Sequence, residues 1–264
     1  MSGTYTPPNM PYDLRAPEGQ FEKKSFTATV GSGTIADIRY RVHIPDRIEG
    51  RVPLVLFLHG AGERGEDNEA QLKAALPTAF SVAGSEMHGA VVIAPQCPSD
   101  LRWVDVPWSE GKYCVLATPE TYLLELVAKL VARYAAEDWV DETRVYVMGI
   151  SMGGFGTWDM LTRHPDLFAA GLPICGGADE TYAKQLAQVP IYTFHGTEDD
   201  AISYQGTAGV VAAIRAQGKG RIHYVQFEGA GHNIWDRALA YAGDGENPPP
   251  MQWLFAQRKQ GGSL

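Results

Sequence analysis

The stretch RVYVMGISMGGFGTWDMLTR, residues 144–163, contains the features that decide the fold. In residues 144–148, Arg144 is followed by a run of valine, tyrosine and methionine that is typical of a buried strand. Residues 153–163 have the length and composition of a helix. Gly149 and Gly153 flank Ser151, and a very sharp strand-to-helix turn requires glycine at these two positions. The stretch therefore predicts a strand, a tight turn that lifts Ser151 out of the sheet, and a helix.

Strand-like and helix-like segments alternate on both sides of this stretch. The other predicted central strands are continuous apolar runs, at residues 53–58, 90–94, 171–174, 190–194 and 222–227. The other predicted helices lie at residues 68–80, 119–136, 201–216 and 250–258. Before them, residues 25–30 and 35–44 alternate in polarity and are joined by a Gly-rich turn, which predicts an antiparallel hairpin. This order predicts an α/β fold with a mixed, mostly parallel sheet of about eight strands and helices on both faces.

The chain shows no internal repeat, low-complexity tract or linker. Residues 1–24 are rich in proline, glycine and charge, and are expected to form an irregular arm. Residues 25–264 are expected to form one catalytic domain. Within it, the irregular stretch at residues 96–118 is long, and a loop of that length is more often functional than idle.

The composition narrows the range of partners. Hydrophobic residues make up 45 % of the chain, enough for a sizeable core. With 22 basic and 31 acidic residues, the net charge of −9 disfavours nucleic acid, membrane surfaces and strongly anionic substrates. Neither a secretory signal nor a run of about 18 apolar residues is visible, so a cytoplasmic protein is expected. Three cysteines predict reduced thiols, with a Cys97–Cys114 disulfide as the alternative.

Ser151 is the predicted nucleophile, and a serine hydroxyl needs a general base because it is a weak nucleophile at neutral pH. At a turn of this kind the acid and then the histidine follow the serine along the chain. His232 lies in a Gly-containing loop after the strand at residues 222–227, so it is the expected base. His59 and His195 precede glycine at strand ends, where they are expected to hold loops by hydrogen bonds.

The acid that orients the base should follow a later core strand. The strand at residues 190–194 leads into a segment with three consecutive carboxylates. Asp199 is the first choice, Asp200 the second and Glu198 the third. The alternative is that this acidic run is a solvated turn.

An oxyanion hole requires two backbone N–H donors. The residue after the nucleophile, Met152, is predicted to supply one. The other is expected from the Gly-rich loop HGAGERG at residues 59–65, with Ala61 as the first candidate. Gly62 is the second candidate, and it is also expected to contact the substrate. The loop lacks the G-K-[ST] ending of a phosphate-binding loop.

Aromatic residues near these segments are candidates for lining the substrate pocket, and each has plain packing as its alternative. They are Trp103 and Trp108 in the long loop, and Trp235 just after the predicted base. Glu63 and Arg64 are expected to form an ion pair that holds the oxyanion loop, with recognition of a substrate carboxylate as the alternative role for Arg64. No metal-binding motif is visible, so neither a metal nor a cofactor is predicted.

Four motifs stand in the order that is found in small microbial α/β-hydrolases. They are LHGAGERG at 58–65, GISMG at 149–153, HGTED at 195–199 and GHNIWD at 231–236. Over about residues 50–258 the chain resembles the phospholipase/carboxylesterase and dienelactone-hydrolase group. It also resembles feruloyl and acetylxylan esterases, polyhydroxybutyrate depolymerases and predicted peptidases. The resemblance implies the α/β-hydrolase fold without a separate cap domain, and a triad of Ser151, Asp199 and His232. Dienelactone hydrolases use a cysteine nucleophile, so Ser151 speaks against that activity.

The resemblance and the residues together predict a serine carboxylesterase that works through an acyl-enzyme. Short-chain acyl, acetyl or hydroxycinnamoyl esters are the expected substrates, either small or linked to an oligosaccharide. The alternatives are a serine peptidase acting on small peptides and a lysophospholipase or thioesterase. A binding protein without catalysis on the same scaffold is a further hypothesis.

Overall fold

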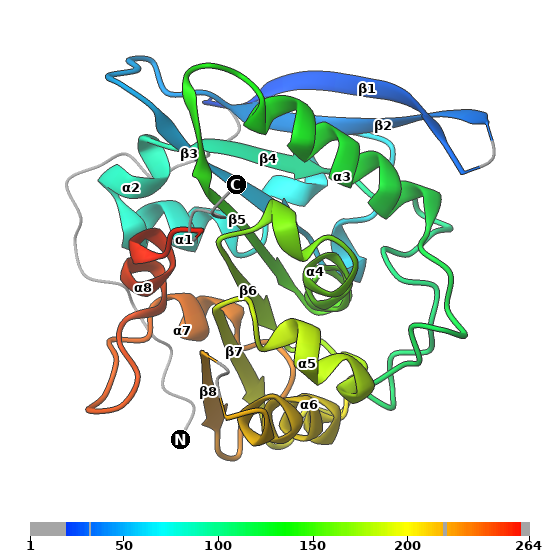
Figure 1. The fold of residues 1–264 in the computed structure, drawn as a ribbon, viewed down its shortest axis with the longest axis vertical. Helices are drawn as coiled ribbons and strands as arrows, with labels where there is room; N and C mark the ends of the chain where they lie inside the picture. Colours follow the sequence, from blue (N-terminus) through cyan, green and yellow to red (C-terminus); the bar gives the residue numbers. More distant parts are fainter. Residues whose placement is uncertain (1–19, 32, 219–220, 260–264) are drawn as a thin grey trace.

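The computed structural model describes residues 20–31, 33–218 and 221–259 (Figure 1). The strands of this part form one eight-stranded sheet in the order β1-β2-β4-β3-β5-β6-β7-β8. They are β1 (Glu22–Val30), β2 (Thr34–His43), β3 (Val52–Leu58), β4 (Val91–Pro95), β5 (Val140–Ile150), β6 (Ala170–Ile174), β7 (Ile191–Gly196) and β8 (Ile222–Phe227). The pairs β1–β2 and β2–β4 are antiparallel, and all other neighbours are parallel. The predicted mixed, mostly parallel sheet is confirmed.

Helices cover both faces of the sheet, as predicted. The α-helices are α1 (Leu76–Ala83), α2 (Ser85–His88), α3 (Tyr122–Ala135), α4 (Met152–Arg163), α5 (Ala183–Leu186), α6 (Tyr204–Ala216), α7 (Trp235–Leu239) and α8 (Pro250–Ala256). The short 3-10 helices are η2 (Ala61–Glu63), η3 (Ala70–Leu72), η4 (Pro165–Leu167) and η5 (Glu180–Tyr182). Helices α3 to α6 pack on one face, and α1, α7 and α8 pack on the other (Figure 1).

Strand β3 shows how one strand serves two cores. Leu54, Leu56 and Leu58 pack in the core beneath α3 and α4, whereas Val55 and Phe57 pack in the core beneath α1 and α8. All five side chains are fully buried. Successive side chains of a strand point to opposite faces, so a strand covered on both faces is apolar throughout. Each such burial contributes roughly 2 kcal/mol of hydrophobic stabilisation.

The single helix predicted at residues 68–80 is wrong, because the segment is broken into η3 and α1. Asn68 and Ala75 have φ angles of 53° and 61°, in the left-handed region that a right-handed helix cannot include. Tertiary contacts hold Asn68 in this conformation. Its N–H donates to Gln96 Oε1 at 2.6 Å, and its Nδ2 donates to the carbonyl of Tyr40 at 3.1 Å.

Several boundaries also differ from the prediction. Strand β1 begins at Glu22, inside the segment that was expected to be irregular, and residues 1–19 of that arm lie outside the described residues. Helices α3 and α6 begin a few residues later than predicted. The reason is that Thr121 and Ser203 cap them, each side chain accepting a backbone N–H of the first turn.

All three cysteines are free thiols. Cys97 and Cys175 are buried, and Cys114 is exposed. The alternative of a Cys97–Cys114 disulfide is therefore not realised. None of the helices formed by the described residues combines the length and the apolar character needed to cross a lipid bilayer.

Candidate active site

Loops from four strands meet at one edge of the sheet. Ser151 follows β5, Asp199 follows β7, His232 follows β8, and Ala61 follows β3. These strands run parallel, so their carboxyl ends lie at the same edge, where ligand sites of open α/β sheets form. Residues that are far apart in the sequence are thus brought together by the topology of the sheet.

Ser151, His232 and Asp199 form a continuous hydrogen-bonded chain. Ser151 Oγ lies 2.8 Å from His232 Nε2, and His232 Nδ1 lies 2.7 Å from Asp199 Oδ2. The Asp199 side chain is fully buried, and the His232 side chain is 17 % exposed. Glu198 and Asp200 are exposed. The structure thus brings Asp199, and neither of its acidic neighbours, to the imidazole.

The turn at Ser151 has a strained backbone that depends on the flanking glycines. Ser151 has a φ of 54°, a conformation that costs an L-residue about 1–3 kcal/mol. A Cβ at Gly149 would lie 2.4 Å from the Gly153 carbonyl oxygen, and a Cβ at Gly153 would lie 1.9 Å from the Leu58 carbonyl oxygen. Both distances are far below contact distance, so only glycine fits. The N–H of Ser151 donates to the Ile174 carbonyl at 2.9 Å, which ties the turn to β6.

Asp199 is held as a carboxylate. Its Oδ1 accepts the backbone N–H groups of Ala201 and Ile202 at 3.0 and 2.8 Å. Burial acts to raise the pKa of Asp199. The hydrogen bonds from His195, His232 and the Ile202 N–H outweigh burial and hold the pKa below its ordinary value. The ionised carboxylate therefore accepts the Nδ1–H of His232, which leaves Nε2 free to take a proton from Ser151.

His195 lies closer to this chain than the sequence indicated. It was expected only to hold a loop, but its Nε2 lies 3.1 Å from Asp199 Oδ2, and the ring is fully buried. The signal in the sequence was the four-residue spacing between His195 and Asp199 in the HGTED motif. That spacing alone does not show which atom of the carboxylate the ring contacts.

The two predicted oxyanion donors lie at helix starts. Met152 and Ala61 are the first residues of α4 and η2, where N–H groups have no partner within the helix. Burial raises the pKa of Glu63, whereas hydrogen bonds from the N–H groups of Gly60 and of Glu63 itself lower it, and the net shift is upward. The Glu63 N–H also donates to the Gly60 carbonyl at 3.4 Å. Within the described part of the chain, no acceptor contacts the N–H of Ala61 or Gly62.

The predicted ion pair between Glu63 and Arg64 is replaced by contacts to the main chain. Arg64 donates through Nε to the Ala61 carbonyl at 3.0 Å and through Nη1 to the Leu101 carbonyl at 3.2 Å. Its guanidinium also lies over the Trp108 ring, 5.8 Å from the centroid. Arg64 therefore ties the oxyanion loop to the long loop at residues 96–118.

The prediction that Trp103 lines the substrate pocket is wrong. Its side chain is fully buried, its Nε1 donates to the His59 carbonyl at 3.0 Å, and its ring packs against that of His59. Trp103 instead supports the oxyanion loop from within the core. Trp108 is half-buried beneath two guanidinium groups, those of Arg64 and Arg102. Trp235 is half-buried with its ring 5.8 Å from the His232 ring, which it meets edge-on.

His59 is a neutral, fully buried imidazole at the base of the oxyanion loop. Its Nε2 accepts the Cys97 N–H at 2.9 Å, so Nδ1 carries the proton and donates to the Gly60 carbonyl at 2.6 Å. Burial lowers the pKa of His59 to about 4, with a smaller lowering from the charge of Arg64. The hydrogen bond to Gly60 opposes this shift.

We expect His59 to make the protein less stable as the pH falls from about 6.5 towards 4. In this range the unfolded chain binds a proton at His59 that the folded chain excludes, at about 1.4 kcal/mol per pH unit. The free energy of unfolding, measured in urea, should therefore fall by about 2 kcal/mol more between pH 7 and pH 5 in the wild type than in His59→Gln. The same pH dependence in both proteins would contradict this assignment.

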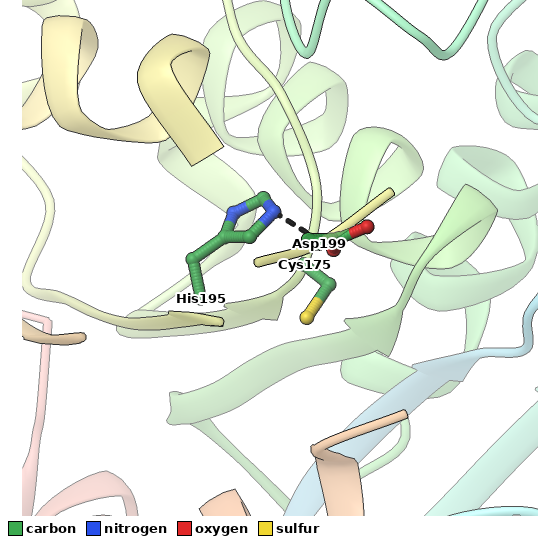
Figure 2. A group of neighbouring side chains, drawn as sticks. All are labelled: Cys175, His195 and Asp199. Atoms are coloured by element: carbon green, nitrogen blue, oxygen red, sulfur yellow. Dashed lines mark hydrogen bonds and ion pairs between the residues drawn. The ribbon is translucent and has the colours of Figure 1, made fainter. Parts of the chain in front are cut away.

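A second cluster of ionisable side chains adjoins the hydrogen-bonded chain of Ser151, His232 and Asp199. Cys175, His195 and Asp199 place their ligand atoms within 4.8 Å of one another, and Figure 2 shows the His195 ring directed at Asp199 with the thiol nearby. This donor set resembles those that bind zinc. However, His195 Nε2 faces oxygen acceptors and carries a proton, and burial raises the pKa of the Cys175 thiol well above its ordinary value. The arrangement therefore fits hydrogen bonding better than metal ligation.

Solvent reaches the site beside His232. A hollow of about 600 Å³ borders this residue, and Asn233, Ile234 and Arg237 are among the residues that line it. The imidazole is therefore accessible from outside, whereas the carboxylate behind it is shielded from water.

Comparison of the sequence with known proteins identifies relatives that are named as esterases. A model of the prolyl oligopeptidase family matches residues 124–186. The bifunctional acetylxylan esterase/xylanase XynS20E of Neocallimastix patriciarum is 29% identical over 176 residues, which cover 67% of this chain and 23% of that protein. Feruloyl esterase B of Neurospora crassa is 26% identical over 154 residues, which cover 58% of this chain and 49% of that protein.

Comparison of the structure with solved structures also identifies proteins that are named as esterases. A thermostable esterase superposes with a TM-score of 0.74 at 31% identity, covering 91% of this chain and 64% of that one. A ferulic acid esterase superposes with a TM-score of 0.61 at 18% identity, covering 89% of this chain and 100% of that one. At 18% identity, the similarity to the ferulic acid esterase concerns the fold alone. This chain spans less than two thirds of the thermostable esterase and of both curated relatives.

Proposed function

We propose that this chain, which has the α/β-hydrolase fold and is related to the esterases of that superfamily, is a serine carboxylesterase. The observation that carries this proposal is the hydrogen-bonded chain from Ser151 through His232 to the buried Asp199. A serine hydroxyl paired with an imidazole, itself oriented by a carboxylate, is the arrangement that activates serine for acyl transfer.

The geometry supports a two-step reaction through an acyl-enzyme. Ser151 Oγ attacks the carbonyl carbon of the ester while His232 Nε2 takes the hydroxyl proton. The developing oxyanion accepts the N–H groups of Met152 and Ala61, and the positive end of the α4 helix adds to its stabilisation. His232 then gives the proton to the departing alcohol. A water molecule, deprotonated by His232, attacks the acyl-enzyme, and His232 returns this proton to Ser151 Oγ as the bond to the acyl group breaks and the acid is released.

The substrates we propose are uncharged acyl esters, including acetyl and hydroxycinnamoyl esters. Relatives named acetylxylan esterase and feruloyl esterase support this range. The net charge of −9 disfavours strongly anionic esters. Trp235 beside His232, together with Trp108 and Gly62, remains a proposed substrate contact.

A panel of esters tests the proposal. The wild-type protein is expected to hydrolyse p-nitrophenyl acetate and butyrate, and to react at Ser151 with a fluorophosphonate probe, as located by mass spectrometry. Methyl ferulate distinguishes a hydroxycinnamoyl esterase from an esterase for short aliphatic acids. Absence of both turnover and labelling in the folded protein would contradict catalysis and favour a binding protein.

Peptide hydrolysis is the second candidate, favoured by the match of the prolyl oligopeptidase family to residues 124–186. The same triad cleaves amides when the active site positions a peptide. Aminoacyl-p-nitroanilides discriminate between the two activities. Turnover of these amides above that of p-nitrophenyl esters would replace the esterase proposal by a peptidase.

A further inference from the structure

Two imidazoles share one oxygen of the triad carboxylate. Asp199 Oδ2 lies 2.7 Å from Nδ1 of His232 and 3.1 Å from Nε2 of His195 (the latter contact is drawn in Figure 2). Both side chains at the second contact, His195 and Asp199, are fully buried. The proposed triad accounts for the first contact only.

The proton on His195 can be placed from its neighbours. Nε2 faces two oxygen acceptors, Asp199 Oδ2 and the carbonyl of Ile202, each at 3.1 Å. A nitrogen lone pair directed at two acceptors would be repelled by both, so Nε2 carries a hydrogen and donates it. His195 and His232 therefore both donate to the same carboxylate oxygen.

The ring of His195 is itself fixed from two further elements. Its Nδ1 lies 2.8 Å from Thr207 Oγ1 on α6, and the same oxygen lies 2.6 Å from the Gly176 carbonyl oxygen, just beyond β6. The single hydroxyl hydrogen of Thr207 serves one of these two contacts at a time. The ring thus sits at the end of β7, clamped between β6 and α6. Such a ring is a rigid support for the carboxylate, because the contacts at Nδ1 lie outside the loop that carries Asp199.

We propose that His195 is a positioning residue of the triad, whose Nε2–H holds Asp199 Oδ2 in the orientation that His232 requires. This inference rests on the proposed esterase function. Backbone N–H groups fix Oδ1, and His195 is the second donor that fixes Oδ2. Without it, the imidazole of His232 is the remaining histidine contact of Oδ2 among the described residues, and this is the ring that Oδ2 is meant to orient.

Few titratable side chains face Asp199, so the effect of losing the His195 contact can be assigned to a named partner. The titratable side chains that face the carboxylate are His195, His232 and the thiol of Cys175. Burial raises the pKa of that thiol, so it stays protonated and uncharged near neutral pH. Among the described residues, removing the His195 donor therefore leaves the imidazole of His232 in contact with Asp199 Oδ2.

The test compares His195→Ala with His195→Gln, whose side-chain amide can donate from the position of Nε2. In His195→Ala we expect kcat/KM for p-nitrophenyl acetate to fall about 10- to 100-fold, by analogy with the loss of a hydrogen bond that orients a metal ligand. The acid limb of the pH profile should move to higher pH. An oxygen that has lost one donor binds the other more strongly, which favours protonated His232. His195→Gln should recover most of the activity and the wild-type acid limb.

A buried histidine away from the site provides the matched control. His43 on β2 is 6% exposed, and within the described residues its ring nitrogens contact the carbonyls of Gln20 and His88. His43→Ala should lower the melting temperature without moving the pH profile. If His195→Ala behaves in the same way, its role is structural and the proposal is overturned. The proposal is equally overturned if His195→Gln is folded but as impaired as His195→Ala.

A measurement without turnover separates this inference from the esterase proposal. The titration of His232 can be followed by NMR in the wild type and in His195→Ala. If the wild type hydrolyses no ester but the titration of His232 shifts upward in the variant, the esterase proposal fails and the role of His195 stands. An unshifted titration overturns the role of His195 whatever the activity.

Discussion

Replacing Ser151 by alanine is expected to lower ester turnover by a factor on the order of 10⁶, close to the loss seen when a serine hydrolase loses its nucleophile. The hydroxyl is the only group of the proposed site that forms a bond to the substrate, so no neighbour can take its place. The residual rate should come from the oxyanion donors and from binding alone. The measurement is hydrolysis of p-nitrophenyl acetate, with thermal unfolding recorded in parallel.

The melting temperature of Ser151→Ala should match that of the wild type. Alanine at position 151 retains the φ of 54° and therefore neither relieves nor adds backbone strain. Ser109, an exposed residue of the long loop at residues 96–118, allows the same serine-to-alanine substitution outside the proposed active site. Ser109→Ala should retain full activity. Esterase turnover that survives in folded Ser151→Ala would rule out Ser151 as the nucleophile.

Replacing Asp199 by asparagine is expected to lower turnover by about 10⁴-fold, the loss that follows when the triad acid becomes an amide. Asp199 accepts the Nδ1–H of His232 and the Nε2–H of His195 at one oxygen. If asparagine turns its NH₂ group to this side, it meets two donors and imposes the wrong tautomer on His232. If it turns its oxygen there, it still lacks the charge that stabilises the imidazolium formed during the reaction.

The chain itself supplies the controls for Asp199. Glu198 and Asp200 flank it, carry the same charge and are exposed. Glu198→Gln and Asp200→Asn should stay within about twofold of the wild-type rate, as exposed substitutions usually change free energies by less than 0.5 kcal/mol. A loss in Asp200→Asn that equals the loss in Asp199→Asn would contradict the hydrogen-bond pattern described here.

The strands and the turn at Ser151 could be predicted because their causes leave recurring patterns in the sequence. The crowding at Gly149 comes from the Gly153 carbonyl within the turn, and the crowding at Gly153 comes from the Leu58 carbonyl of β3. Both positions therefore require glycine. Continuous apolar runs mark strands that are covered on both faces. The sequence therefore determined the order of strands and helices, the place of the proposed nucleophile and the segments that hold its proposed partners.

The tertiary structure decided what depends on contacts between distant segments. The helix predicted at residues 68–80 breaks because Gln96 and Tyr40 hold Asn68, and neither contact is visible in the segment itself. Trp103 lies in the core and does not line a pocket, and its Nε1–H donates to the His59 carbonyl there. Tryptophan is common both in cores and in substrate pockets, so the residue type alone could not show which of the two Trp103 occupies.

Contacts made by the folded chain also decide which of the three adjacent carboxylates, Glu198, Asp199 or Asp200, meets His232. Side-chain direction within an irregular loop follows from its backbone conformation, and here two backbone N–H groups and two imidazoles converge on Asp199. The sequence by itself determined that Ser151 would stand at a sharp turn and that an acid and a histidine would follow it. Only the folded sheet, which brings the ends of β5, β7 and β8 to one edge, decided that Asp199 reaches His232 and that His195 reaches Asp199.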